Sequence, residues 1–332
     1  MIWVAWRQHR AVLLSLAAYA VVFTGLVVFM HVRLASQLDA EEVAACFGQA
    51  PDRFCEDAKG YWDLRARLFN LDELARAAVF GFAALAGAFV GAPMFAREWE
   101  QRTHLLALSQ SISPRRWFTT RVAVVLAATV LGAALLGAAQ WWATMSLAAP
   151  LDVWKRLQPR YFEAQPVALI GYTLFAVALG IAAGLLLRRT LPAMAVTLVG
   201  VLGAVYAVRM FARPNYTTPV VATIPFDDPA QSASIDPGRW SLAQGFSDLD
   251  GRFVEDEEAA YEALSRCEQL PGEPGDARYV QCAADSGLTG TANLVHPGSR
   301  FWAFQFIEFG LFALAAAALI ALSLWWLRKR ST

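Results

Sequence analysis

The sequence predicts an all-α membrane protein with six transmembrane helices and both termini on the cytoplasmic side. Two features of the composition lead to this fold class. The chain of 332 residues is 57% hydrophobic and only 17% charged, whereas a soluble domain has about 45–50% apolar and about 25% charged residues. The apolar residues also occur in blocks of about 20, the length that a helix needs to cross a hydrocarbon core. The alternative, a soluble all-α protein with buried helices, fits these features poorly.

Each predicted span is a long apolar run with few or no charged residues inside it. In chain order the spans are Ala11–Met30, Ala75–Phe95, Val122–Ala148, Pro166–Leu187, Pro192–Phe211 and Phe301–Leu327. An even number of spans places both termini on one side of the membrane.

The Lys and Arg residues beside the span ends predict which side faces the cytoplasm. With the N-terminus inside, 12 basic and two acidic residues lie in short cytoplasmic segments. The basic residues are Arg7, Arg10, Arg97, Arg102, Arg115, Arg116, Arg121, Arg188, Arg189, Arg328, Lys329 and Arg330. Tryptophans cluster at both predicted boundaries, as in an aromatic belt. We therefore expect a multi-pass protein of the cell (plasma) membrane.

The spans divide the chain into segments. Residues 1–10 are predicted to form a cytoplasmic amphipathic elbow. Residues 11–211 contain the first five spans, with an extracellular loop at 31–74 and a cytoplasmic loop at 96–121. Residues 212–300 are one extracellular segment, and residues 301–332 contain the sixth span and a basic cytoplasmic tail.

The cytoplasmic loop has the pattern of two helices separated by a break. Residues 97–110 have the content of a short surface helix, which Ser111–Ser113 interrupt. Ser113 and Pro114 suit the N-cap and the first position of the following helix. The simpler alternative is a positively charged loop that only fixes the topology.

The four cysteines lie in the two predicted extracellular segments. Cys46 and Cys55 lie in loop 31–74, and Cys267 and Cys282 lie in segment 212–300. Local pairing on an oxidising side predicts two disulfides, although pairings that link the two segments stay open. Neither pair has a nearby His or C-x-x-C spacing, which makes a zinc site a poor competitor.

The two extracellular segments differ in character. After Asp63, leucines at three- and four-residue spacing predict an amphipathic helix that leads into the second span. Segment 212–300 begins Pro- and Thr-rich, contains a helical candidate at 255–270, and carries 14 acidic against six basic residues. It is either a solvated, disulfide-stapled cap or a lid or receptor face for a cationic substrate.

Small residues at four-residue spacing predict close helix packing in the membrane. Gly87 and Gly91 lie in the second span, Ala128 and Gly132 in the third, and Gly180 and Gly184 in the fourth.

Glu308 is a carboxylate well inside the sixth predicted span, where an acid is costly unless it is paired or faces water. Arg209 lies at a suitable depth to pair with it, and Gln140 and Gln305 could join the same network. This cluster is either a structural clamp between helices or a substrate or gating contact.

Motifs of nucleotide, metal and nucleophilic chemistry are absent from the sequence. It contains no G-x-x-x-x-G-K-[ST] phosphate loop, no H-E-x-x-H and no G-x-S-x-G. We therefore expect a conduit or scaffold without a cofactor or metal of its own, rather than an enzyme. Energy for active transport would come from a partner.

Three stretches resemble the permease subunits of ABC-2-type transporters, especially an actinobacterial group. WVAWRQHR is similar to the elbow before the family's first span. GAPMFAREWEQRTHLLALSQSISPRRWFTTR is similar to the family's segment between the second and third spans, and FWAFQFIEFGLF to the opening of its last span. The extracellular segment 212–300 is larger than the short paired helices of simpler members.

The resemblance implies an exporter whose coupling helix docks on a separate cytosolic ABC ATPase. The implied docking residues are Glu98, Trp99, Glu100, Arg102, Thr103, His104 and Gln110. ATP and Mg²⁺ would bind to the ATPase. The other implied partners are membrane lipid and a second permease subunit, either a copy of this chain or a relative, and no nucleic acid is expected.

Two further functions compete with a permease. The chain could be a membrane-anchored sensor or scaffold whose extracellular segment binds a ligand and whose inner loop recruits a signalling protein. It could also be an intramembrane enzyme that depends on Glu308. A neighbouring gene for an ATPase would favour the permease, and a neighbouring kinase gene would favour the sensor.

Overall fold

The computed structural model describes residues 2–38, 59–101, 114–151, 157–228, 238–269 and 276–331. The chain divides into two compact units. The helical unit comprises Met1–Val153, Pro159–Met210 and Ala303–Thr332, and the sheet unit comprises Trp154–Gln158 and Phe211–Trp302. Each unit is described separately below.

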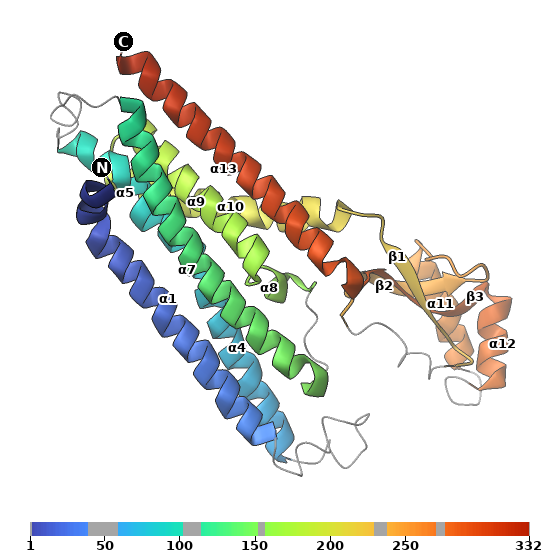
Figure 1. The fold of residues 1–332 in the computed structure, drawn as a ribbon. Coiled ribbons are helices and arrows are strands. Elements are labelled where there is room, and N and C mark those ends of the chain that lie inside the picture. Colours follow the sequence, from blue (N-terminus) through green and yellow to red (C-terminus); the bar gives the residue numbers. More distant parts are fainter. Residues whose placement is uncertain are drawn as a thin grey trace. The chain divides into compact units, whose positions relative to one another are not determined.

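Within the described residues, six helical stretches are long and apolar enough to cross a membrane, as the sequence predicts. The first four are built from α1 (Ile2–Leu38), α4 (Lys59–Ala86) continued by the π-helix η1 (Gly87–Gly91) and α5 (Ala92–Glu100), α7 (Pro114–Leu151) and α9 (Pro166–Leu187). The last two are α10 (Thr190–Ala207) continued by the π-helix η2 (Val208–Ala212), and α13 (Phe301–Ser331). Figure 1 shows the long helices as one bundle, with the short α8 (Pro159–Phe162) before α9.

Two helices extend beyond the predicted spans. The predicted elbow at residues 1–10 is continuous with α1 from Ile2 onward. The predicted amphipathic stretch after Asp63 is the beginning of α4, which runs on into the second span.

Helix α9 lies at the centre of the bundle and has the largest buried share of the six stretches. It packs against α4, η1, α5, α7 and α10, and its Gly171 approaches Phe309 of α13. The centre of the helical unit is therefore filled by a helix.

Glycines allow the backbones of η1 and α9 to touch. A Cβ atom added at Gly180 would lie 2.3 Å from the carbonyl oxygen of Gly87, and one at Gly184 would lie 2.4 Å from that of Ala92. A Cβ at Gly91 would lie 2.6 Å from the carbonyl oxygen of Val177. The predicted close packing is thus confirmed for the second and fourth spans, which present their small residues to each other.

We expect Gly180→Ala to lower the free energy of unfolding by about 2 kcal/mol or more, since overpacking costs about 1–3 kcal/mol and a backbone atom cannot move aside easily. The measurement is thermal unfolding of the full-length protein in detergent. The matched control is Gly203→Ala, because nothing lies within 4 Å of the added Cβ in α10. An equal loss in the two variants would contradict the packing argument.

The sheet unit contains β-structure, which corrects the all-α prediction. Its three strands are β1 (Val220–Pro225), β2 (Trp240–Asp248) and β3 (Leu288–His296). Strand β3 lies between the other two and pairs antiparallel with both. Short β-branched runs such as VVATIP are weak strand signals when Pro residues lie beside them. The paired residues are also distant in the chain, up to 75 positions for Val220 and Val295.

Two helices complete the sheet unit, α11 (Glu257–Glu268) and α12 (Ala277–Asp285). The first confirms the helix predicted at 255–270, and Asp256 caps it by accepting a hydrogen bond from the Ala259 N–H at 3.0 Å. Phe246 of β2 and Leu288 of β3 share a buried core with Leu264 of α11.

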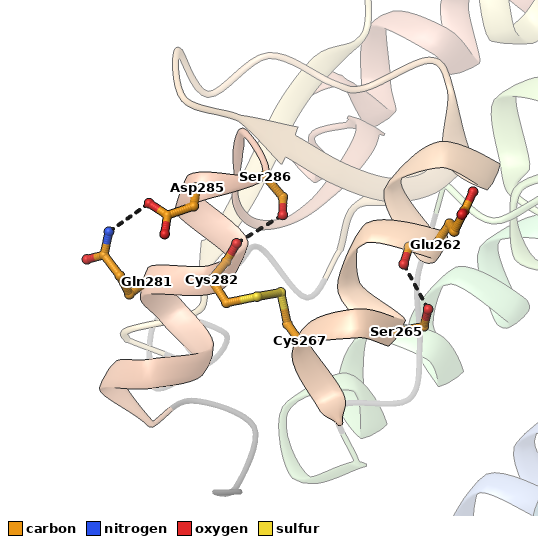
Figure 2. The surroundings of a disulfide bond; sticks show 7 residues. All are labelled: Glu262, Ser265, Cys267, Gln281, Cys282, Asp285 and Ser286. Atoms are coloured by element: carbon orange, nitrogen blue, oxygen red, sulfur yellow. Dashed lines mark hydrogen bonds between the residues drawn. A yellow bond between two sulfur atoms is a disulfide. The ribbon is translucent and has the colours of Figure 1, made fainter. Parts of the chain in front are cut away.

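A disulfide links α11 to α12, as the sequence predicts for Cys267 and Cys282 (Figure 2). The bond excludes a pairing of either cysteine with the loop at 31–74. Beside it the Ser286 hydroxyl donates to the Cys282 carbonyl oxygen at 3.0 Å. Cys46 and Cys55 lie outside the described residues.

Side chains join the segment before β1 to the segment after β3. Nε2 of His296 lies 2.9 Å from the Pro214 carbonyl oxygen, and Nδ1 lies 3.3 Å from Nη1 of Arg300. Arg300 also donates to the Thr218 carbonyl oxygen at 2.6 Å. Because an arginine only donates, Nδ1 accepts and Nε2–H donates to Pro214, so this geometry requires a neutral His296.

Burial is the main cause that lowers the pKa of His296 below its ordinary value. The hydrogen bond to Pro214 opposes this lowering of the pKa, and the charge of Arg300 adds to it. The unfolded chain therefore binds this proton at higher pH than the folded chain. The free energy of unfolding then decreases as pH falls through the ordinary His value toward the folded pKa.

We expect acidification from about pH 7.5 to about pH 5.5 to destabilise the sheet unit, and His296→Gln to weaken this dependence because the side chain no longer titrates. The measurement is proteolysis of the sheet unit in the full-length protein along a temperature ramp. The prediction fails if the two proteins respond equally to pH.

Candidate functional site

The candidate site lies where five helix ends share one hydrophobic cluster. Leu13 of α1 and Leu185 of α9 are buried in this cluster, and Trp99 of α5, Trp117 of α7 and Trp326 of α13 pack against it. We call this region the Trp99 end. It contains the start of the segment that the sequence singles out, but Arg102, Thr103, His104 and Gln110 lie outside the described residues.

Glu98 forms a hydrogen-bonded ion pair with Arg121 of α7. The Arg121 side chain is 5% exposed and that of Glu98 is 20% exposed. The guanidinium also lies over the Trp117 ring, 4.5 Å from its centroid. Because a nearly buried cation is costly without a partner, this pair fixes the last turn of α5 against the first turns of α7.

Glu100 caps the N-terminus of α10. One carboxylate oxygen accepts the Thr190 N–H at 3.0 Å, and the other accepts the Thr190 hydroxyl at 2.6 Å. Arg189, the N-cap residue of α10, makes no capping hydrogen bond with its own side chain. A carboxylate at this position also interacts favourably with the helix dipole.

Trp99 stacks on a cation from the turn between α9 and α10. Cζ of Arg188 lies 4.6 Å from the Trp99 ring centroid and 5.5 Å from the centroid of Trp326 in α13. One guanidinium thus touches two indole rings from different spans.

Three consecutive residues, Glu98, Trp99 and Glu100, therefore fix the last turn of α5 to the ends of α7, α9 and α10. The family resemblance implies that these residues meet a partner protein, and the structure shows contacts within their own chain. Their partners Arg121 and Arg188 enter the sequence reasoning only as basic residues beside span ends. Trp117, one turn before Arg121, is a sequence signal that could have marked Arg121, whereas residues 176–205 around Arg188 contain no aromatic residue.

We expect Glu98→Ala to lower the free energy of unfolding by about 2–3 kcal/mol, because it leaves Arg121 nearly buried without its anion. Adding Arg121→Met should recover part of this loss. Thermal unfolding in detergent measures both variants. Arg115→Ala, an exposed arginine of the same helix, is the matched control, and a loss equal to that of Glu98→Ala would contradict the ion-pair argument.

Glu308 is buried in the helical unit and accepts a hydrogen bond from the Tyr172 hydroxyl of α9. Tyr172 packs edge-on against Phe80 and Phe312. Arg209, the expected partner, lies on η2, and no ion pair joins it to Glu308 in the part of the chain that the structure describes. The partner of this carboxylate is instead the Tyr172 hydroxyl on the central helix, which the sequence analysis does not single out.

Gln305 connects α13 to the turn between α8 and α9. Its Oε1 accepts the Ala168 N–H at 2.9 Å, and its Nε2 donates to the Phe162 carbonyl oxygen at 3.0 Å. Gln165, the N-cap residue of α9, makes no capping hydrogen bond with its own side chain. Gln305 therefore caps α9 from another span, which favours the structural clamp among the two interpretations of this cluster.

Gln140 is buried on α7, and its backbone carbonyl oxygen accepts a hydrogen bond from the Thr144 hydroxyl at 2.7 Å. Across the described ranges, His, Cys, Asp and Glu residues do not gather in groups of three or more that could hold a metal ion.

Residues 17–213 match a family model described as ABC-2 membrane transporter related. The match covers more than half of the chain, from the first predicted span to the end of the fifth. No match was found among curated proteins or among solved structures.

Proposed function

The chain belongs to the ABC-2 membrane transporter related family and is a membrane-embedded transporter permease, and we propose that it is the permease subunit of an ABC exporter. A separate cytosolic ATPase docks on the segment at 97–117. ATP binding to this ATPase displaces the segment, and the helical unit moves in response.

The observation that carries this proposal is the fixation of the last turn of α5. Residues 102–113 follow soon after this turn, and Glu98, Trp99 and Glu100 hold the turn against the ends of α7, α9 and α10. A force on the segment would therefore pass into the bundle instead of bending a loose loop. We assign docking to Arg102, Thr103, His104 and Gln110, and we assign the three held residues to the base of the docking segment.

We assign ATP hydrolysis to the partner. The sequence contains no G-x-x-x-x-G-K-[ST] motif, whose backbone amides and lysine would hold the phosphates. ATP and Mg²⁺ would accordingly bind to the ATPase subunit.

The charge distribution supports an orientation with the Trp99 end in the cytoplasm. Basic residues concentrate beside the spans on the side of the N-terminus, and segment 212–300 carries an excess of acidic residues. In this orientation an ATPase can reach the docking segment, and the disulfide faces an oxidising compartment. We propose that substrate moves outward from the cytoplasm.

We further propose that two permease subunits assemble, either two copies of this chain or this chain and a relative. Helix α9 fills the centre of one bundle and packs directly on its neighbours. A substrate path between two bundles does not require this centre to open.

We expect co-purification with the ABC ATPase encoded nearest to this gene. Alanine replacement of Arg102, His104 and Gln110 together should reduce the recovered ATPase by about tenfold, because docking contacts dominated by a few residues are lost. The measurement is the molar ratio of ATPase to permease after affinity purification from detergent.

The control for this experiment is Arg10→Ala, which removes a basic residue of the same predicted side outside the segment. Full recovery of the ATPase with the triple variant would contradict docking at this segment. Capture of a kinase with no ATPase would favour the sensor or scaffold.

A further inference from the structure

Arg188 has an unusual backbone conformation at the C-terminus of α9. Its φ is 55° and its ψ is 15°, and among the described residues no other non-glycine residue has a positive φ. In this left-handed region the Cβ of an L-residue crowds the following carbonyl oxygen, and glycine is the usual residue at such helix ends. An arginine at this position keeps a side chain where glycine would be less strained.

That side chain lies between rings from two spans. Trp99 is the second-last residue of α5, and Trp326 lies near the end of α13. All three side chains are half-buried. A planar guanidinium can stack on an aromatic face in a way that a compact ammonium cannot, so arginine suits this site better than lysine.

The residues on either side of Trp99 contact other helices. Glu98 reaches α7 and Glu100 reaches α10. Arg188 joins this end of α5 to α13 through Trp326, whose ring packs against the same hydrophobic cluster as Trp99. Helix α13 is the span that directly follows the sheet unit in the chain.

We propose that Arg188 is a positioning residue that transmits displacement of the docking segment from α5 to the end of α13. This inference rests on the proposed function, since it assumes that an ATPase moves the segment. Arg188 itself contacts neither ATP nor substrate in this role.

The first test needs no ATPase. Hydrogen–deuterium exchange is measured on the full-length protein in nanodiscs for wild type, Arg188→Lys and Arg189→Lys. Loss of the stacked guanidinium should raise amide exchange at residues 325–331 about fivefold. The exposed neighbour Arg189 gives the control that changes one arginine to lysine without touching the rings. Unchanged exchange at 325–331 in Arg188→Lys overturns the proposal.

The second test uses the complex with the ATPase, with and without ATP. In wild type, ATP should change exchange both at the start of α10, which Glu100 holds, and at the end of α13. Arg188→Lys should keep the response of α10 and lose that of α13, with the ATPase still bound. Trp326→Leu removes one ring and should give the same result as Arg188→Lys. It tests the proposal if the arginine variant does not fold.

The outcomes separate the two proposals. A response of α13 that survives in Arg188→Lys overturns the positioning role, and so does loss of ATPase binding in this variant, which would make Arg188 a docking residue. Failure of the wild-type chain to bind the ATPase overturns the proposed function and the transmission role with it, while the first test still decides whether Arg188 holds α13.

Discussion

The start of a helix leaves backbone N–H groups without a partner inside the helix, and the arrangement of the bundle depends on how these groups are satisfied. Neither α9 nor α10 is capped by the side chain of its own N-cap residue. Gln305 of α13 caps the first, and Glu100 of α5 caps the second. Each capping hydrogen bond therefore also joins two spans. It fixes the position of one span along the other as well as the start of the capped helix.

Polar side chains also join the helices at both ends of the helical unit. At the Trp99 end, Glu98 and Glu100 hold the turn that precedes residues 102–113. Toward the other end of α9, Tyr172 and Glu308 join α9 to α13 in a buried site. Helix α13 thus makes polar contacts to the central helix through Gln305 and Glu308 and is joined to α5 through Arg188, in addition to its apolar packing.

Much of the fold could be predicted because lipid imposes length and composition on each span. The six spans, the glycine contact between the second and fourth, and the Cys267–Cys282 pair follow from local patterns. The sheet could not be predicted with the same ease, because β1 pairs with a strand far along the chain. The partners of Glu98, Glu100 and Glu308 were also missed, since spacing along one helix carries no information about which other helix faces it. Gln305 was singled out as a polar residue, but its role as a cap becomes visible only when the start of α9 lies beside it.

The contact between η1 and α9 limits how the molecule can change shape. Because backbone meets backbone at these glycines, sliding of one segment along the other would bring main-chain atoms into collision. The second and fourth spans then form a single rigid unit. A conformational change of the bundle would come from rotation or tilting of the remaining spans around this unit.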